Sequence, residues 1–137
     1  MKSLKSLGLA TICAITLCTT SSTIKADGFE YGKLNLLSSK SEFAPALEAE
    51  YVVVKFSANW CTSCIQLTSV FEDLAQNYEN ILFVEIDIDS FKSLSTSYGV
   101  RSIPTVFFFK NGEKALRTVG FRSEDFWATK ISETFNL

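Results

Sequence analysis

The chain has 137 residues, with 13 lysines and arginines, 15 aspartates and glutamates, and no histidine. The lack of histidine excludes His-based catalytic triads, histidine general bases and histidine metal ligands. Hydrophobic residues make up 47% of the chain, which is enough for one domain with a substantial core.

The first 26 residues have the pattern of a secretion signal. Lys2 and Lys5 give a positive start, and residues 7–18 form an uncharged, mostly apolar stretch that is short for a bilayer span. Polar residues follow, and Ala26 is a suitable last residue before cleavage. We therefore expect residues 1–26 to be a cleaved signal peptide, and their short apolar stretch makes an uncleaved anchor helix the weaker alternative.

Cleavage would leave residues 27–137 as a single domain. This part carries ten bases against 15 acids, a net charge of −5, because three of the 13 bases precede Ala26. That balance argues against nucleic acid and against an anionic membrane surface as partners. Of the four cysteines only Cys61 and Cys64 would remain. A zinc site needs about four ligands, so we expect no metal unless two chains share one.

Hydrophobic periodicity predicts alternating strands and helices. The apolar run at 51–57 is typical of a central strand buried on both faces, and Asn111-Gly112 predicts a hairpin turn. In chain order we expect strands at 34–37, 51–57, 81–89, 105–109 and 115–119, with helices from a cap near Ser41, over 61–78, over 91–98 and from a cap at Ser123. This order favours one α/β domain with a mixed central β-sheet flanked by helices on both faces.

The cysteine pair lies where the strand at 51–57 gives way to a helix. Cys61 is expected at the helix N-terminus, where backbone N–H groups and the helix dipole stabilise a thiolate. Cys64 lies one turn further on, within reach of a mixed disulfide formed on Cys61. The chemistry that this spacing implies is thiol–disulfide exchange.

Three separated motifs resemble those of the thioredoxin family. They are VVKFSANWCTSC at 53–64, YGVRSIPT at 98–105 and FKNGE at 109–113. They occur in the family's order, and the resemblance extends from about Leu34 to the C-terminus. It implies the thioredoxin fold for almost the whole chain after the signal.

The resemblance also implies roles for the residues around the cysteines. Cys61 would be the nucleophile and Cys64 the buried resolving thiol, and the two would form the redox disulfide. Pro104 would be the family's cis-proline facing this pair, which is physically reasonable because an Xaa–Pro bond has only a small cis penalty.

Four residues would line a shallow apolar groove in which a partner's disulfide docks, namely Trp60, Ile103, Pro104 and Gly120. In the family, the loop at Ile103 offers backbone hydrogen bonds to an extended substrate segment. The structural alternatives are ordinary packing for Trp60, a strand-start proline at Pro104 and a simple bend at Gly120.

Two positions between and after the cysteines depart from the family pattern. Thr62-Ser63 stands where cytosolic thioredoxins have Gly-Pro, so an additional backbone N–H is available near Cys61. An added donor stabilises the thiolate, and we expect a less reducing couple than in a cytosolic thioredoxin. Ile65 replaces a common basic residue and works in the opposite direction.

Lys55 stands where the family usually has a buried acid that helps to deprotonate the resolving thiol. Glu85 falls where a lysine normally pairs with that acid. We predict a swapped ion pair, in which Glu85 accepts the proton of Cys64 directly or through water. The alternative is that Lys55 extends to solvent and Glu85 is an ordinary surface residue.

The sequence therefore predicts an exported thiol–disulfide oxidoreductase, periplasmic or secreted, that most simply reduces protein disulfides. It needs no organic cofactor, because the cysteine pair carries the electrons. Expected partners are proteins with disulfides or thiols and a membrane redox partner, and we expect a monomer. The alternative is a peptide-binding or assembly module in which the Cys61–Cys64 disulfide is only a structural clip.

Overall fold

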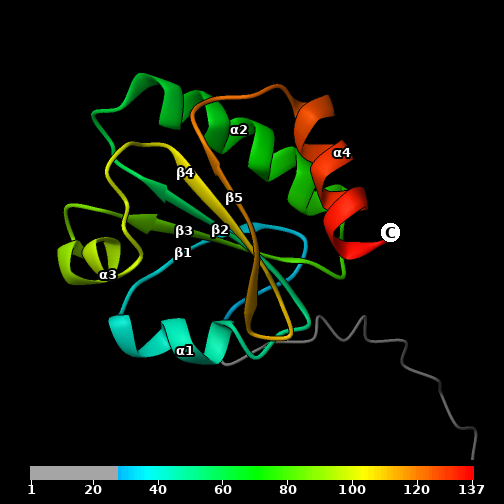
Figure 1. Ribbon diagram of the computed structural model, residues 1–137, viewed down its shortest axis with the longest axis horizontal. Helices are drawn as coiled ribbons and strands as arrows, with labels where there is room; N and C mark the ends of the chain where they lie inside the picture. Colours follow the sequence, from blue (N-terminus) through cyan, green and yellow to red (C-terminus); the bar gives the residue numbers. More distant parts are fainter. Residues whose placement is uncertain (1–27) are drawn as a thin grey trace, which may run out of the picture.

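The computed structural model describes residues 28–137 (Figure 1). The predicted signal peptide at 1–26 lies outside the described residues, so it stays a prediction. Among residues 28–137, no helix combines the length and the apolar character needed to cross a membrane.

A five-stranded mixed sheet forms the centre of the molecule, in the order β1-β3-β2-β4-β5. Its strands are β1 (Leu34–Leu36), β2 (Tyr51–Ser57), β3 (Leu82–Asp87), β4 (Thr105–Lys110) and β5 (Glu113–Val119). β1 and β2 both pair with β3 in parallel, whereas β4 pairs antiparallel with β2 and with β5. The central strand β2 is buried on both faces after its first residue, as its continuous apolar run predicts.

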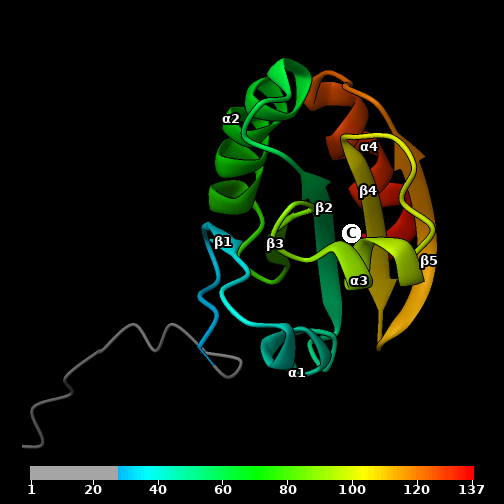
Figure 2. The ribbon, with the colours of Figure 1, turned by 90° about the vertical axis from the view of Figure 1, so that its left-hand side faces the viewer.

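Helices cover both faces of this sheet, which confirms the predicted layers. They are the 3-10 turn η1 (Lys40–Glu42), α1 (Phe43–Ala46), α2 (Thr62–Asn77), α3 (Lys92–Ser97) and α4 (Glu124–Phe135). Figures 1 and 2 show α2 and α4 on one face of the sheet and α1 and α3 on the other. We call these the α2/α4 face and the α1/α3 face.

Each face of the sheet has its own apolar core. On the α1/α3 face, Phe56 and Phe107 pack with the half-buried Tyr98. On the α2/α4 face, Phe71 packs edge-on against Trp127, and both side chains are almost fully buried. The apolar stripe of α2, which includes Leu67, Phe71 and Leu74, is therefore the surface that holds this helix, and its N-terminus, on the sheet.

Among the predicted boundaries that differ from the structure, two have a clear local cause. The first cap is Ser39 and not Ser41, because the Ser39 hydroxyl accepts the N–H of Ser41 and Glu42 reaches back to the N–H of Ser39 in a capping box. The strand expected at 81–89 ends at Asp87, whose carboxylate accepts the N–H of Asp89 and so starts a turn.

The predicted hairpin turn is confirmed. Asn111 and Gly112 both have positive φ, 50° and 78°, as a two-residue hairpin turn requires. The turn brings β5 back along β4, and the far end of this hairpin leads to Gly120, which lies beside the proline loop described below.

Candidate active site

The two cysteines are joined by a disulfide at the start of α2. Cys61 is the N-cap of the helix, in an extended conformation, and the N–H of Cys64 points to its sulfur at 3.3 Å. The Ser63 hydroxyl lies 3.4 Å from the same sulfur. These groups surround the position where negative charge would form on Cys61, as expected for a thiolate at a helix N-terminus.

Burial distinguishes the two cysteines from each other. Cys61 is 9% exposed, whereas Cys64 is completely buried. Ala58 and Ile103 pack around the pair. Only Cys61 offers any surface to an incoming disulfide, which agrees with the roles of nucleophile and resolving thiol that the resemblance implies.

The loop before β4 has the conformation that the resemblance implies. The Ile103–Pro104 peptide bond is cis, and Ile103 packs against the cysteines. The N–H of Gly120, which has a φ of +90°, donates to the carbonyl of Pro104 over 2.8 Å. This hydrogen bond ties Gly120 to the loop whose Ile103 packs against the disulfide. The roles of Pro104 and Gly120 in substrate binding stay predictions.

Trp60 lies on the surface next to the nucleophile. Its side chain is 65% exposed, and its indole N–H donates to Asp89 over 2.7 Å. The ring is therefore not part of the apolar core. A large ring held by one hydrogen bond beside Cys61 is suited to contacts with another protein, although its part in binding stays a prediction.

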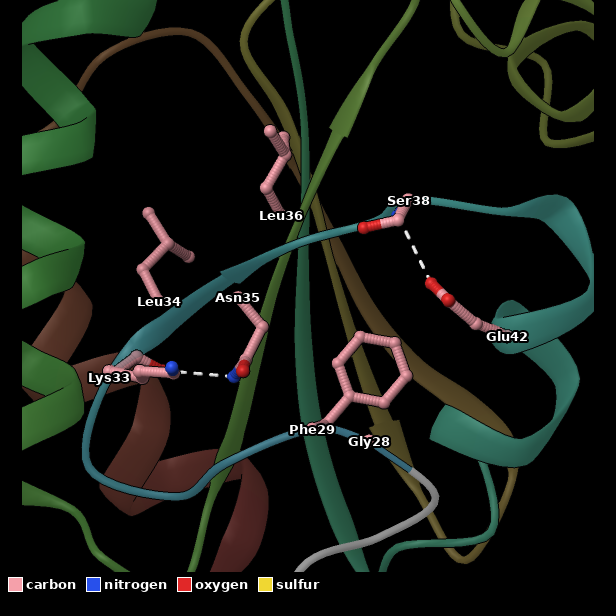
Figure 3. Close-up of a pocket in the computed structure, with 8 residues that line it drawn as sticks. All are labelled: Gly28, Phe29, Lys33, Leu34, Asn35, Leu36, Ser38 and Glu42. Atoms are coloured by element: carbon pink, nitrogen blue, oxygen red, sulfur yellow. Dashed lines mark hydrogen bonds between the residues drawn. The ribbon is translucent and has the colours of Figure 1, made fainter.

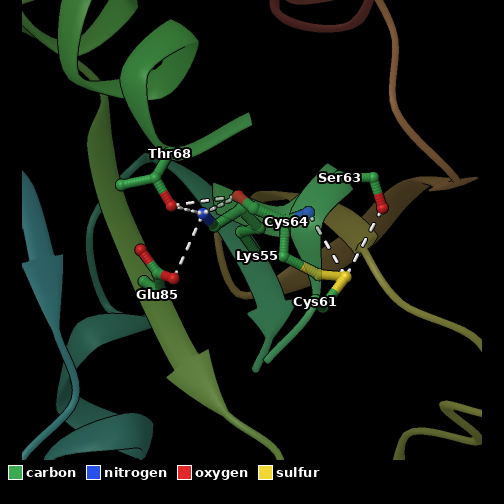
Figure 4. A network of polar contacts seen from close by, with 6 residues as sticks. All are labelled: Lys55, Cys61, Ser63, Cys64, Thr68 and Glu85. Carbon is green, nitrogen blue, oxygen red and sulfur yellow. Dashed lines mark hydrogen bonds and ion pairs between the residues drawn. A yellow bond between two sulfur atoms is a disulfide. The ribbon is translucent and has the colours of Figure 1, made fainter. Parts of the chain in front are cut away.

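Lys55 and Glu85 form the predicted ion pair. The side chain of Lys55 is 0% exposed, and its ammonium lies 3.1 Å from Glu85, which is 18% exposed. The same ammonium donates to the Cys64 carbonyl over 3.3 Å and to the Thr68 hydroxyl (Figure 4). The alternative in which Lys55 extends to solvent is therefore wrong. The proton-accepting role of Glu85 stays a prediction.

The environment of Lys55 disfavours its charge. Burial lowers the pKa of Lys55 below its ordinary value, and the nearby Glu85 carboxylate offsets part of that effect. The three polar contacts of the ammonium match its three N–H donors. A buried ammonium is tolerated here because all of its hydrogen bonds are made.

A pocket of about 430 Å³ opens beside this ion pair. Its polar wall includes Thr68, Glu72, Glu85 and Asp87, and its apolar wall includes Leu34, Leu36 and Ile65. Glu85 thus faces an open space on one side and the buried ammonium on the other.

A second pocket, of about 260 Å³, lies along β1 (Figure 3). Asn35 beneath it donates to the carbonyls of Glu30, Lys33 and Phe83, and Glu42 accepts the N–H of Ser38. These contacts explain its polar groups as parts of the fold. The cysteine pair and its neighbours do not line it, and we assign it no function.

Two residues of the site were missed in the sequence. Thr68 lies one helical turn after Cys64, and its hydroxyl bonds both the Cys64 carbonyl and Lys55. That spacing was a readable signal. Asp89 falls at the end of the strand expected at 81–89, and only the turn after β3 brings it to Trp60.

Comparisons with known proteins agree with this geometry. A family model described as thioredoxin matches residues 35–133. Thioredoxin H5 of Oryza sativa subsp. japonica is 37% identical over 116 residues, which cover 79% of this chain and 86% of the relative. Human thioredoxin is 36% identical over 96 residues, which cover 68% of this chain and 91% of the relative.

Solved structures give the same result. A mutant thioredoxin from Halobacterium salinarum superposes with a TM-score of 0.72 at 29% identity, covering 77% of this chain and 94% of that one. The predicted thioredoxin fold is thereby confirmed. The chain belongs to the thioredoxin family and is a thiol–disulfide oxidoreductase with a Cys61–Cys64 pair.

Proposed function

We propose that the protein is an exported reductase of protein disulfides that acts through a mixed disulfide on Cys61. The observation that carries the proposal is the difference between the two sulfurs. Cys61 keeps a small exposed surface of 9% at a helix N-terminus, and Cys64 is completely buried one turn further on. This difference supports an order in which Cys61 attacks first and Cys64 resolves.

The proposed cycle balances without an organic cofactor. The Cys61 thiolate attacks a substrate disulfide, which forms the Cys61–substrate bond and releases one substrate cysteine as a thiolate. The Cys64 thiolate then attacks Cys61, which forms the Cys61–Cys64 disulfide and releases the second substrate cysteine. Two electrons pass to the substrate, and two protons are distributed among the released thiols and the solvent.

Export adds a requirement for a redox partner. The positive start and apolar stretch of the first 26 residues support a secretory route to a periplasm or the cell exterior. A reductase outside the cytosol needs electrons from a membrane protein, since it is separated from soluble nicotinamide-driven reductases. Expression of the full chain, fractionation and N-terminal sequencing test this part, with Asp27 as the expected first residue and a cytosolic, uncleaved chain as the contradicting result.

Trapping tests the mixed-disulfide step. In the Cys64→Ser variant we expect covalent complexes between Cys61 and substrate proteins, which a reductant dissolves. The Cys61→Ser variant is the matched control and should trap far less, since the remaining thiol is buried. If Cys64→Ser traps nothing and its Cys61 alkylates no faster than an ordinary thiol at neutral pH, the pair is a structural clip in a binding module.

The direction of electron flow is tested by the reduction potential of the pair, measured against glutathione. A value near about −270 mV, as in thioredoxin, supports a reductase. A value near about −120 mV, as in a strong periplasmic oxidant, would instead make the protein a disulfide donor.

A further inference from the structure

We infer that the buried Lys55–Glu85 pair drives the resolving step: the Lys55 ammonium stabilises the Cys64 thiolate, and Glu85 passes the proton of Cys64 to water in the adjoining pocket. The inference rests on the proposed function, because it concerns the second step of the same cycle. In place of the single buried acid that the family resemblance leads one to expect, two residues of opposite charge would help to deprotonate Cys64.

The charge of Lys55 acts in the opposite sense to that of a buried acid. A carboxylate near the resolving thiol repels the thiolate that forms there. Such a carboxylate can therefore assist only by accepting the proton of the thiol. An ammonium in the same place lowers the energy of the thiolate, because opposite charges attract strongly where water is excluded. The Lys55 ammonium lies next to Cys64, since it donates to the backbone carbonyl of that residue over 3.3 Å.

The contacts of Lys55 hold its charge in place. Glu85 at 3.1 Å favours the charged form against the cost of burial, and the Thr68 hydroxyl takes a further N–H. Thr68 also donates to the Cys64 carbonyl over 3.0 Å, so the ammonium and the first turn of α2 are fixed to each other. Lys55 is therefore a positioning residue for the charge that forms on Cys64.

Glu85 connects this buried cluster with solvent. Its carboxylate touches the ammonium on one side and lines the pocket of about 430 Å³ on the other. The pocket is open and polar on this wall, so water can enter it and bridge to the carboxylate. Cys64 itself is completely buried, and its proton needs such a route to leave.

The resolving step then balances as follows. The Cys64 thiol gives its proton to the Glu85 carboxylate through water, while the Lys55 ammonium stabilises the thiolate that remains. The thiolate attacks Cys61, the bond between Cys61 and the substrate breaks, and the substrate leaves as a thiolate. Glu85 then returns its proton to water in the pocket.

The charged groups that face the cluster come from two elements. Glu85 and Asp87 lie on β3, and Glu72 lies on α2 in the same pocket wall. On β4, the residue opposite Lys55 is the apolar Val106. Glu72 acts on Lys55 only at longer range, which makes it a suitable control for a lost carboxylate.

Stopped-flow reaction of the reduced protein with the coloured aromatic disulfide dithiobis-nitrobenzoate tests the inference. The first phase releases one coloured thiolate as Cys61 attacks, and the second releases another as Cys64 resolves. We expect Lys55→Met to slow the second phase about tenfold at neutral pH, which corresponds to about one pKa unit in the Cys64 thiol. The rate should recover as the pH rises, and the first phase should change far less.

Glu85→Gln should slow the second phase as well and shift its pH profile upward, whereas the matched Glu72→Gln should behave as the wild type. A second phase that is unchanged or faster in Glu85→Gln, or an unchanged pH profile in Lys55→Met, would overturn the inference. Glu85→Gln remains a complete test if Lys55→Met does not fold. Failure of the proposed function would look different, because the first phase itself would then be as slow as that of an ordinary thiol.

Discussion

The two faces of β2 differ at the level of the active site. Toward α1 and α3, Phe56 is fully buried among aromatic rings. Toward α2, the neighbouring Lys55 is equally buried but lies among Thr68, Glu85 and the Cys64 carbonyl. The packing of aromatic rings around Phe56 stabilises the fold, whereas burial of the Lys55 ammonium costs free energy. The difference suggests that the α1/α3 face serves stability and that this end of the α2/α4 face serves chemistry.

The largest effect is expected on the aromatic side. Phe56→Ala removes a ring that lies 5.7 Å from Phe107 and 5.9 Å from Tyr98, centroid to centroid, and leaves a cavity in a closed core. We expect the free energy of unfolding to fall by about 3–5 kcal/mol, measured by urea denaturation of the oxidised protein. A loss below about 1 kcal/mol would show that the aromatic face is not the main source of stability.

Replacing the polar cluster with apolar residues should raise the free energy of unfolding instead of lowering it. In the double variant Lys55→Met with Glu85→Leu, apolar side chains would fill the same space beside Leu34 and Leu36. Buried ion pairs are often less stabilising than apolar residues of similar volume, so we expect the free energy of unfolding to rise by about 1–4 kcal/mol. The two single variants complete a double-mutant cycle that isolates the pair. A double variant less stable than the wild type would mean that the cluster also holds the fold together.

The sequence predicted the apolar layers better than the polar contacts. The stripe of α2 and the run at 51–57 follow directly from periodicity. Leu67, Phe71 and Leu74 of the stripe are buried, Val70 and Tyr78 are half-buried, and the run is buried after its first residue. The Lys55–Glu85 pair was also predicted, because both positions belong to a family pattern with its charges exchanged, and the strand register places them side by side.

Contacts that depend on turns and rotamers were harder to predict. Asp89 reaches Trp60 only because the chain turns after Asp87, and no local sequence pattern predicts that contact. The cap at Ser39 was different, since Ser39 and Glu42 have the spacing of a capping box in the sequence itself. Ser41 is also a suitable capping residue by type, and only the hydrogen bonds in the structure show that Ser39 is the cap.

The smallest effect that distinguishes the two faces concerns pH. Tyr98 packs against Phe43, Phe107 and Phe109, and burial raises the pKa of Tyr98 above its ordinary value of 10.0. Above that value the unfolded tyrosine loses a proton that the folded one keeps, so stability falls as the pH rises further. The lowered pKa of Lys55 gives the opposite slope between its folded value and 10.5, because only in that range does the unfolded lysine bind more protons than the folded one.

Tyr98→Phe keeps the ring and removes only the titrating hydroxyl. We expect its free energy of unfolding to lie within about 0.5 kcal/mol of the wild type at neutral pH and to fall less on going to strongly alkaline pH. Urea denaturation of both proteins at a neutral and an alkaline pH measures the difference, in which the contributions of all other groups cancel. Equal losses in the two proteins would mean that the phenol of Tyr98 is as free to ionise in the folded state as in the unfolded one. The alkaline limit of the fold would then arise elsewhere than on the aromatic face.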